Sequence, residues 1–523
     1  MQQPLGMARL ALSAVLVMAL GACNVLPPRG APEPSHALAV GEDTPLARIA
    51  QTSRPSHETL PSGFRLLPSG ESAFAARLAL VALAARSIDA QYYHVHDDTA
   101  GHALLRALRD AARRGVRVRL LVDDLYSGPI DELLRALADE PQAQVRLFNP
   151  LPVRAGPPLA RMALSWPQFE RINHRMHNKL LVVDGVVALY GGRNIGDAYF
   201  MRDGEANFVD LDVLSTGAVV RELADAFDLY WNSDRVWDVH TVLGQASQSD
   251  RSAFDRHGAL AHANLHQEPA RDALGQTPVA QQLAAGRLTL HFGSASVVPD
   301  PPSKSVAAAA RSQPGAAMRA QLDIIEAARS DVALSSPYFL PGGQAMHLLL
   351  DARRRGIQAL VLTNSLGSTD EPLVYFAYAP HRAEMLRQGI ELYELAPTLA
   401  RDAGGFGSFG GSIARLHAKL ATVDRRWLLV GSVNFDARSA AINTEMAVAI
   451  DCPALALEAM RVLAGDAFRS MYRLRLAADG QGLEWVSSDA DGRVQVSTRE
   501  PHDDLWLRLR LKLQSLFVGE DQL

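Results

Sequence analysis

The chain has 523 residues, 48% of them hydrophobic, so it is long enough to bury a large core in two or three domains. Its formal net charge of −5 gives no support to nucleic-acid binding, and we expect no nucleic-acid partner. One of its two cysteines, Cys23, lies in a targeting segment, which leaves Cys452 alone. No disulfide is therefore expected within the mature chain.

Residues 1–22 predict a bacterial lipoprotein signal peptide. The apolar run LALSAVLVMAL follows Arg9 and is too short to span a bilayer as a stable helix. It ends in LGAC, which resembles a lipobox with Cys23 as the lipidated residue; the alternative is an ordinary signal peptide that happens to contain cysteine. Asn24 after the cysteine favours the outer membrane. We expect a lipid-anchored protein of the bacterial cell envelope that faces the periplasm.

Composition predicts how the rest of the chain is divided. Residues 23–60 are rich in proline, alanine and polar groups and predict a flexible tether. Residues 61–235 and 316–475 predict two domains, and the polar, proline-rich residues 236–315 predict a linker with irregular insertions. Residues 476–523 are a C-terminal extension, in which DLWLRLRLKLQSLF predicts a helix on a membrane surface or, equally, one docked on the body.

The two predicted domains repeat one pattern. AARSIDAQYYHVHDD and DAARRGVRVRLLVDD in the first match AARSDVALSSPYFLP and DARRRGIQALVLTNS in the second. Each copy predicts a helix, a strand, a second helix and another strand, which indicates an α/β fold with crossover helices and a mixed, largely parallel sheet. The matching elements lie 240 to 243 residues apart, and such constant spacing indicates an internal duplication.

Lysine is rare in this chain, and its positions are informative. Of 52 Lys and Arg residues only four are lysine: Lys179, Lys304, Lys419 and Lys512. Lys179 and Lys419 share one context, HNKLLVVD and HAKLATVD, with a histidine before each lysine and an aspartate after it. Because lysine is a compact point charge and arginine a rigid fork, the repeated context indicates a role that arginine cannot fill.

Each of these motifs predicts a strand that enters a hairpin. Side chains alternate along a strand, so His177 and Lys179 face the same way. A two-residue turn at Asp184-Gly185 pairs Val183 with Val186 and His177 with Gly192, and places Asn194 just beyond. In the second copy the same geometry orients His417 with Lys419 and places His417 opposite Ser432, with Asn434 just beyond.

Two such half-sites, related by a pseudo-twofold axis, bring together two histidines, two lysines and two asparagines. This set suits phosphodiester chemistry without a metal or other cofactor. One neutral histidine attacks phosphorus, and the other, protonated, gives a proton to the leaving oxygen. Lysines and asparagines hold the non-bridging oxygens in the transition state. A metal site is the competing interpretation, but a lysine beside each histidine repels a cation.

The paired motifs, with GGRN and GSVN after them, resemble the HxKxxxxD motifs of the phospholipase D superfamily. Within it the chain is most similar to bacterial cardiolipin synthases of the C type, on SIDAQYY, RMHNK, VGGRNIGDAYF, TNSL, NFDARS and NTEM. The resemblance runs from about residue 60 to the C-terminus. It implies two similar phospholipase D-like α/β domains related by a pseudo-twofold axis, with the active site at their interface.

The resemblance also implies roles for individual residues. His177 and His417 match the nucleophile and the general acid/base; His177 is taken as the nucleophile by analogy, with the reverse left open. Gly192 stands where the second copy has Ser432, so the half-sites are not expected to contribute equally. The groups that match phosphate-binding positions are Lys179, Lys419, Asn194, Ser432 and Asn434.

Acidic residues complete the set that the resemblance implies. Glu445 in NTEM matches an acid that orients the histidine of the opposite half. Its counterpart in the first copy is Asp210 in FVDLD, with Asp212 as the alternative. Asp184 and Asp424 belong to the catalytic motif, but their place in the turn favours bracing the hairpin over chemistry.

Several neighbouring residues have two interpretations. Tyr92, Tyr93, Tyr338 and Phe339 follow the first strand of each copy and either line a substrate pocket or belong to the core. His174 is expected to be a loop histidine without a partner, because nothing in the sequence pairs with it. Asp436 and Arg438 in NFDARS are expected to form a structural salt bridge. The glycine-rich segment 404–412 predicts a mobile lid or a simple loop.

The function that the resemblance implies is phosphatidyl transfer to phosphatidylglycerol, which makes cardiolipin. Hydrolysis of a phospholipid or nucleic acid by the same two-histidine mechanism is the alternative, and a noncatalytic lipid-binding lipoprotein is a third. The expected partners are phospholipid substrates and a membrane surface. The donor lipid and the involvement of a helper protein stay open.

Overall fold

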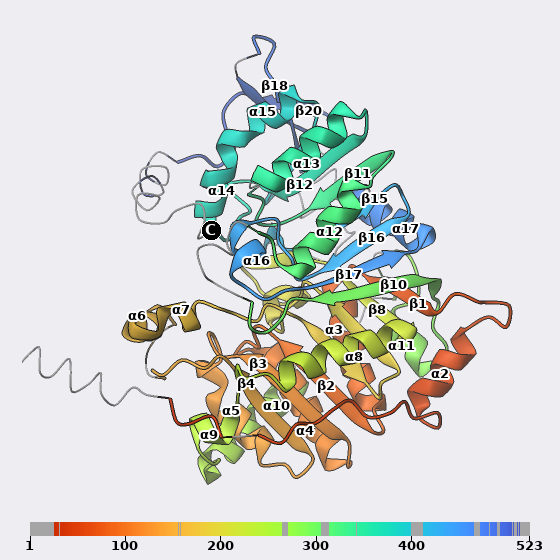
Figure 1. The fold of residues 1–523 in the computed structure, drawn as a ribbon, viewed down its shortest axis with the longest axis vertical. Coiled ribbons are helices and arrows are strands. Elements are labelled where there is room, and N and C mark those ends of the chain that lie inside the picture. The colour runs from red at the N-terminus through yellow and green to blue at the C-terminus, as the bar shows by residue number, and fades with distance from the viewer. Residues whose placement is uncertain are drawn as a thin grey trace, which may run out of the picture.

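The computed structural model describes residues 26–504, apart from 31, 155, 157, 264–269, 273, 305–312, 341–342, 399–411, 465–470, 481 and 489–491, and, beyond them, residues 506, 510 and 512. Cys23, residues 404–411 of the glycine-rich segment and most of the C-terminal tail therefore lie outside the described residues. The body consists of two α/β halves stacked along the long axis (Figure 1). In the part of the chain that is described, no helix is both long and apolar enough to cross a membrane.

The first half is a mixed sheet in the order β1-β8-β6-β5-β2-β3-β4-β9. In this sheet β2, β3 and β4 run parallel to one another and are joined by crossover helices, whereas the other pairings are antiparallel. Its strands are β1 (Ser62–Leu67), β2 (Ser87–Tyr92), β3 (Arg117–Asp123), β4 (Ala143–Phe148), β5 (Leu180–Val183), β6 (Val187–Gly191), β8 (Asp212–Gly217) and β9 (Val236–Asp238).

The second half repeats this arrangement with parallel β11, β12 and β13 and antiparallel β15, β16, β17 and β18. The predicted mixed α/β duplication is therefore confirmed, with a larger antiparallel share than expected. Its strands are β11 (Asp331–Ser335), β12 (Gln358–Asn364), β13 (Glu391–Leu395), β15 (Leu420–Val423), β16 (Trp427–Gly431), β17 (Met446–Asp451), β18 (Met471–Leu476), β19 (Leu483–Ser488) and β20 (Val494–Ser497).

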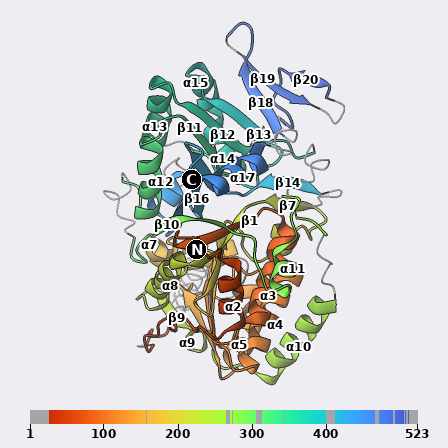
Figure 2. The ribbon, with the colours of Figure 1, turned by 90° about the vertical axis from the view of Figure 1, so that its right-hand side faces the viewer.

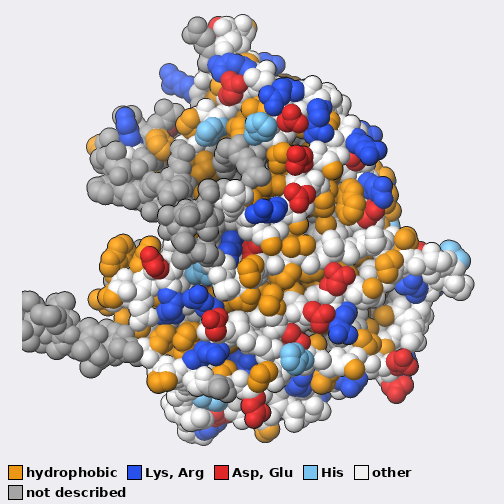
Figure 3. Space-filling model, in the orientation of Figure 1, with side chains coloured by type: hydrophobic (Ala, Val, Ile, Leu, Met, Phe, Trp, Pro, Cys, Tyr) orange, Lys and Arg blue, Asp and Glu red, His pale blue; other side chains and the backbone are white. Residues whose placement is uncertain are grey.

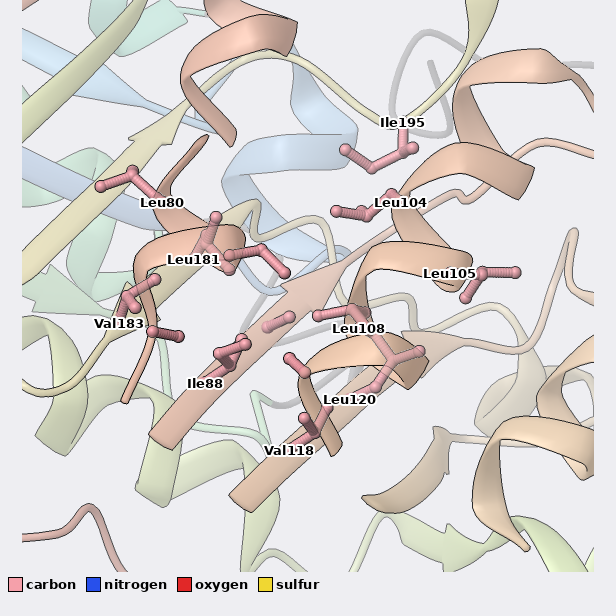
Figure 4. Close-up of a cluster of buried hydrophobic side chains, with 14 of the residues drawn as sticks. Leu80, Ile88, Leu104, Leu105, Leu108, Val118, Leu120, Leu181, Val183 and Ile195 are labelled. Carbon is pink, nitrogen blue, oxygen red and sulfur yellow. The ribbon is translucent and has the colours of Figure 1, made fainter. Parts of the chain in front are cut away.

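Helices cover the sheets of both halves (Figure 1). Those of the first half are α3 (Gly70–Leu83), α4 (Thr99–Arg113), α5 (Asp131–Ala138), α6 (Pro158–Leu164), α7 (Phe169–Ile172) and α8 (Ala218–Trp231). Those of the second half are α12 (Ala316–Glu326), α13 (Gly343–Arg354), α14 (Pro372–Tyr378), α15 (Arg382–Arg387), α16 (Ala437–Ala441) and α17 (Pro453–Ala464). In Figure 4, Leu104 and Leu108 of α4 lie over Ile88 of β2 and Leu120 of β3.

The two sheets are joined into one by β10 (His291–Pro299). Its first three residues pair with β1, and residues 294–299 pair with β17, so a single strand belongs to both halves. One cluster of buried side chains also spans the junction, with Phe64 and Val213 from the first half and Val448 and Ile450 from the second. The halves are therefore held as one rigid unit by backbone hydrogen bonds and a shared core.

Residues 236–315 differ from the predicted irregular linker. Besides β9 and β10 they contain α9 (Val239–Leu243), α10 (Gln248–Ala263) and α11 (Val279–Ala284). Phe254 and Ala261 of α10 are buried in the core cluster of the first half, together with residues of α4 and α5. The mostly polar sequence of α10, QSDRSAFDRHGALAHA, concealed this helix, because few of its residues are large and apolar.

The catalytic hairpins have a different register from the predicted one. Val183 pairs with Val187, and Val423 pairs with Trp427, so three residues, not two, separate the paired ends. His177 is therefore not opposite Gly192, and His417 is not opposite Ser432; both histidines precede β5 and β15. The motif aspartates begin these turns with positive φ, 55° for both Asp184 and Asp424.

The motif aspartates brace the turns, as their position indicated. Asp184 accepts hydrogen bonds from the backbone amides of Ala85, Arg86 and Ser87, the residues that lead into β2. Asp424 accepts equivalent bonds from the amides of Arg329 and Ser330 before β11. Both carboxylates are thus engaged at the far end of the hairpin and not among the reacting groups.

The predicted flexible tether is bound along the first half instead. The described part of residues 26–40, which we call the strap, runs extended into α2 (Pro45–Ser53). Arg119 donates to the carbonyl of Ser35 at 2.8 Å, and Arg146 donates to the carbonyl of Glu33 at 3.0 Å. Trp231 donates to the Ser35 hydroxyl. The strap supplies acceptors to polar side chains that the sheet buries, which fixes its path.

We predict that Arg119→Leu lowers the stability of the protein and releases the strap. The buried guanidinium pairs with Asp89 at 2.6 Å and Asp228 at 2.8 Å, and its loss removes the buried cation between these two carboxylates. Removing one partner of such a buried pair costs about 3–5 kcal/mol. The measurements are thermal unfolding and the rate of proteolysis within the strap.

The matched control is Arg86→Ala. Arg86 also donates to a strap carbonyl, that of Ala39 at 2.9 Å, but it is exposed. Its loss should change stability by no more than about 1 kcal/mol. Equal melting temperatures for Arg119→Leu and the control would contradict the structural role of the bound strap.

Candidate active site

The two halves meet through a pair of matching backbone contacts (Figure 2). On one side β7 (Ala206–Val209) and β14 (Ile413–Leu416) form a parallel ladder in which Val209 is the partner of Leu416. On the other side Met176 and Thr444 form an isolated parallel bridge. The residues that follow these pairs are Asp210 with His417 and His177 with Glu445. The backbone therefore brings each motif histidine beside an acid of the other half.

Side-chain hydrogen bonds complete both pairs. Nδ1 of His177 lies 3.0 Å from Oε2 of Glu445, and Nδ1 of His417 lies 2.7 Å from Oδ2 of Asp210. A buried carboxylate at Nδ1 fixes the ring and leaves Nε2 as the nitrogen for a substrate. Within the described residues, neither Nε2 has a hydrogen-bond partner. Asp210 and Glu445 thus occupy the positions expected for the orienting acids.

The alternative residue, Asp212, serves another purpose. It is fully buried and accepts hydrogen bonds from Arg77 at 2.9 Å and Arg193 at 3.2 Å. Its carboxylate is therefore neutralised inside the first half, away from His417. Sequence spacing alone did not separate these two aspartates, because both lie at the break between the end of β7 and the start of β8.

The unequal residues Gly192 and Ser432 reflect two ways of holding an acid. A Cβ atom on Gly192 would lie 2.3 Å and 2.7 Å from the carboxylate oxygens of Asp210, so only glycine fits there. Ser432, in contrast, donates its hydroxyl to Oε2 of Glu445 and accepts from the amide of Met446 at 3.0 Å. The predicted phosphate-binding role of Ser432 is therefore not supported by its contacts, since its hydroxyl positions Glu445.

Burial keeps both histidines neutral in the free protein. Desolvation lowers the pKa of His177 to about 4, although Glu445 opposes the shift, and Lys179 adds to it. Desolvation lowers the pKa of His417 well below its ordinary value, and Lys419 and Lys179 lower it further. A neutral imidazole with a free Nε2 is a nucleophile.

The two motif lysines lie at the same place. Both are buried, and their ammonium groups donate to the carbonyl of the preceding histidine, at 2.5 Å for Lys179 and 2.6 Å for Lys419. Burial lowers the pKa of Lys419 to about 8, and burial together with Lys419 holds the pKa of Lys179 well below its usual value. The nearby acids Asp210 and Glu445 are engaged by the two histidines, so the paired ammonium groups form a site for a further negatively charged group.

The motif asparagines have free acceptors. Oδ1 of Asn194 and Oδ1 of Asn434 are buried and have no hydrogen-bond partner in the described part of the chain. Asn194 uses its amide nitrogen to donate to the Tyr199 hydroxyl at 3.0 Å. Buried polar atoms are normally satisfied, so these two amides are available to a ligand in the cleft.

The aromatic residues separate into two groups. Tyr93 lies edge-on to His177, with ring centroids 5.1 Å apart, and Tyr338 lies edge-on to His417 at 6.5 Å. Tyr92 and Phe339, in contrast, are buried in core clusters. The sequence interpretation missed Tyr199, whose ring is 5.1 Å from that of His417.

Two further residues near the cleft were missed or interpreted differently. His94 stacks on Tyr126 with ring centroids 4.8 Å apart. Desolvation lowers the pKa of His94 well below its ordinary value, and the charges of His96 and Lys179 lower it further. The histidine-rich stretch HVHD was the sequence feature that could have indicated His94. The expected salt bridge of Arg438 with Asp436 is replaced: Arg438 donates to Asn173 across the interface at 3.1 Å, and Asp436 caps α16.

His174 is a loop residue without a partner, as expected from the sequence. It is buried, and neither ring nitrogen has a hydrogen-bond partner within the described ranges. Desolvation, followed by nearby cations, lowers its pKa to about 3. In the same described ranges, no three His, Cys, Asp or Glu side chains converge as a ligand set for a metal ion.

Comparison with known proteins agrees with this architecture. Residues 78–231 and 322–466 match the family described as "Cardiolipin synthase, PLD-like domain". The two matched segments cover more than half of the chain and coincide with its two structural repeats. The chain therefore belongs to this phospholipase D-like family.

Individual relatives are named cardiolipin synthases. The chain is 36% identical to cardiolipin synthase C of Escherichia coli K12, over 91% of this chain and 99% of that protein. It is 28% identical to cardiolipin synthase of Geobacillus kaustophilus, over 77% of this chain and 65% of that protein. The crystal structure of phosphatidylserine synthase from Haemophilus influenzae Rd KW20 shares the fold, with a TM-score of 0.56, 13% identity, and coverage of 82% of this chain and 92% of that one.

We predict that Gly192→Ala destabilises the protein and disturbs His417. The added methyl group would force Asp210 from its place beside His417. Such overpacking costs about 1–3 kcal/mol. The control is Gly204→Ala, where an added Cβ meets nothing within 4 Å. Thermal melting and the NMR signals of His417 are the measurements. Unchanged signals in Gly192→Ala would show that the carboxylate does not depend on the glycine.

Proposed function

We propose that this protein transfers a phosphatidyl group to phosphatidylglycerol and so makes cardiolipin, through a phosphohistidine intermediate. The observation that supports the proposal most is the exchange of acids between the halves. Each acid orients one neutral histidine and leaves its Nε2 free. The two free Nε2 atoms thus belong to the same site as the two buried ammonium groups. This arrangement has a nucleophile, a proton donor and an anion site, which are the parts that phosphodiester exchange needs.

The first step forms a bond between phosphorus and Nε2 of His177 and breaks the bond to the alcohol of the donor lipid. His417, which takes up a proton when the anionic phosphodiester enters, gives that proton to the departing oxygen. The ammonium groups of Lys179 and Lys419 stand where the non-bridging oxygens gain charge. Because these cations are buried, their attraction for the transition state is larger than it would be in water.

The second step reverses these roles. His417 removes the proton from a glycerol hydroxyl of phosphatidylglycerol, the oxygen attacks phosphorus, and the bond to His177 breaks. The product is a second phosphodiester. His177 is neutral again, and His417 keeps the proton that it took from the hydroxyl until it serves the next turnover or loses the proton to water as the anionic product leaves. When water takes the place of the alcohol, the same steps give hydrolysis, so exclusion of water decides between transfer and hydrolysis.

The unequal acids support His177 as the nucleophile. Although burial raises the pKa of Glu445, the neighbouring His177 imidazole and other partners hold it below its ordinary value, so the carboxylate stays ionised. Burial raises the pKa of Asp210 more than Lys419 and Arg193 lower it. An ionised carboxylate at Nδ1 stabilises the positive charge that the ring of His177 gains when Nε2 binds phosphorus.

Membrane attachment belongs to the same proposal. We take Cys23 to be lipidated and the protein to work at the periplasmic face of the outer membrane, because the N-terminal sequence has the layout of a lipoprotein signal. A lipid anchor keeps the enzyme at the surface that holds its substrates. Labelling cells with a fatty-acid analogue and comparing Cys23→Ser with the unchanged protein tests this attachment.

We predict that His177→Ala and His417→Ala each reduce turnover by about 10³-fold or more, and that the double variant loses little beyond either one. The two rings act in one sequence of steps, so neither works without the other. The measurement is cardiolipin formed from phosphatidylglycerol in vesicles by the purified protein. Phosphatidic acid without cardiolipin would favour hydrolysis, and substantial turnover in either single variant would contradict the two-histidine mechanism. Addition of a chelator should leave turnover unchanged.

We also predict that Lys179→Arg and Lys419→Arg lose most of their turnover while they keep their melting temperature. A guanidinium retains the charge but is wider and forks its donors, so it displaces the phosphate from the line of attack. Turnover and thermal unfolding are measured on the same preparations. Turnover near that of the unchanged protein would show that a positive charge alone suffices at these positions.

A further inference from the structure

A short insert lies between β4 and the catalytic hairpin of the first half. It consists of α6, a 3-10 turn (Trp166–Gln168) and α7, and we call residues 158–172 the insert. Leu164 and Trp166 in it are 61% and 65% exposed. The ring of Trp166 is tilted against that of Phe169 in the same insert, with ring centroids 4.6 Å apart. Because the side chains of Leu164 and Trp166 are mostly exposed, they present apolar surface to the solvent.

The insert is anchored and presents these side chains in a fixed direction. Arg161 of α6 is 1% exposed and donates to the carbonyl of Val153 at 3.1 Å and to Asp124 at 3.2 Å. Ile172 of α7 packs in a small buried cluster with Leu125 and Leu151. Because the ion pair of Arg161 with Asp124 holds α6 in place, Leu164 and Trp166 do not turn inward to the core.

Cations surround the base of the insert. Arg171 of α7 lies 5.9 Å from the ring of Trp237, and burial, followed by the like charges of Arg175 and Arg235, lowers its pKa to about 10. Glu170 is the opposing charge on the exposed side. In Figure 3 the α6–α7 region protrudes as hydrophobic side chains with Lys and Arg side chains next to it.

The strap begins beside the insert. Trp237, which Arg171 of α7 contacts, donates its indole N–H to the carbonyl of Pro27 at 3.3 Å. Pro27 is the fourth residue after Cys23, so the chain between them reaches at most about 14 Å. A lipid on Cys23 would therefore hold the edge of the molecule that carries the insert close to the bilayer.

The insert also leads directly into the catalytic motif. Asn173, the residue after α7, accepts a hydrogen bond from Arg438 of the second half at 3.1 Å, and His177 follows four residues later. A bilayer that contacts the insert is thus next to the interface between the halves, where both histidines lie.

We propose that the insert is a docking element for an anionic bilayer surface, into which Leu164 and Trp166 enter at the interfacial depth. An amphipathic body with an apolar tip suits the membrane interface, and neighbouring arginines are attracted to anionic head groups. This inference rests on the proposed function, because it adds the surface by which the enzyme reaches lipids in a bilayer.

The test uses the full chain with Cys23→Ser, so that no lipid anchor contributes, and compares two further changes. One protein carries Leu164→Ser and Trp166→Ser, and the matched control carries Leu260→Ser on α10, which removes a leucine that is 63% exposed elsewhere. Binding is measured by cosedimentation with vesicles of phosphatidylglycerol and phosphatidylethanolamine, and with vesicles of phosphatidylcholine alone. Turnover is measured on vesicles and on short-chain phosphatidylglycerol dispersed as monomers.

We expect the double change to weaken binding to the anionic vesicles on the order of tenfold, since two apolar side chains no longer leave water. Turnover on vesicles should fall in parallel, while turnover on monomers and all values for the control stay unchanged. Binding of the double variant equal to that of the control overturns the proposal. So does loss of turnover on monomers together with a lower melting temperature. Absence of cardiolipin with both forms of substrate would instead overturn the proposed function, and the vesicle binding would still decide the role of the insert.

Discussion

The structure depends on the crossed pairing of histidines and acids between the two halves. His177 is oriented by Glu445, and His417 is oriented by Asp210, so neither half contains a complete site. Everything that fixes the halves against each other therefore also fixes the chemistry. The shared strand β10, the ladder of β7 with β14 and the bridge of Met176 with Thr444 serve that one requirement.

The same pairing explains why so many charges are buried at the interface. Two lysines and two acids in a dry site are costly to bury, and the protein offsets this cost with further hydrogen bonds. Lys304 shows how far this extends: it is bonded to Asp300 at 2.8 Å, and Asp300 in turn accepts from the amide of Glu445 at 3.1 Å. In the free site the like charge of Lys419 lowers the pKa of Lys179, and an anionic phosphodiester between them relieves this repulsion. Binding and electrostatic relief thus occur in one event.

The sequence predicted which residues meet better than it predicted the path of the chain. The histidines, lysines and asparagines were predicted from their repeated spacing beside an apolar strand, whereas Glu445 and Asp210 came from the resemblance to a known family, with Asp212 as the alternative. The hairpin register was wrong by one residue, since an aspartate with positive φ makes a longer turn than Asp-Gly suggests. The contact of the Ser432 hydroxyl with Glu445 could not be predicted, because Ser432 follows β16 and Glu445 precedes β17, and only the fold brings them together. The strap was predicted to be a flexible tether because its partners are arginines far away in the chain. Local composition does not reveal such contacts.

The difference between Gly192 and Ser432 has a consequence for how this chain changes over generations. After a duplication the two copies are free to diverge, but here each copy holds the acid that orients the histidine of the other. Gly192 leaves room for the shorter acid, Asp210, whose carboxylate fills the place of a side chain there. Ser432 has a hydroxyl that reaches the longer acid, Glu445. Substitutions at these positions are therefore tolerated in couples: exchanging one member alone either crowds the carboxylate or leaves it unsupported. We expect the two members of each pair to change together in evolution, because they are separate in the chain and in contact in the fold. The pairs are Gly192 with Asp210 and Ser432 with Glu445.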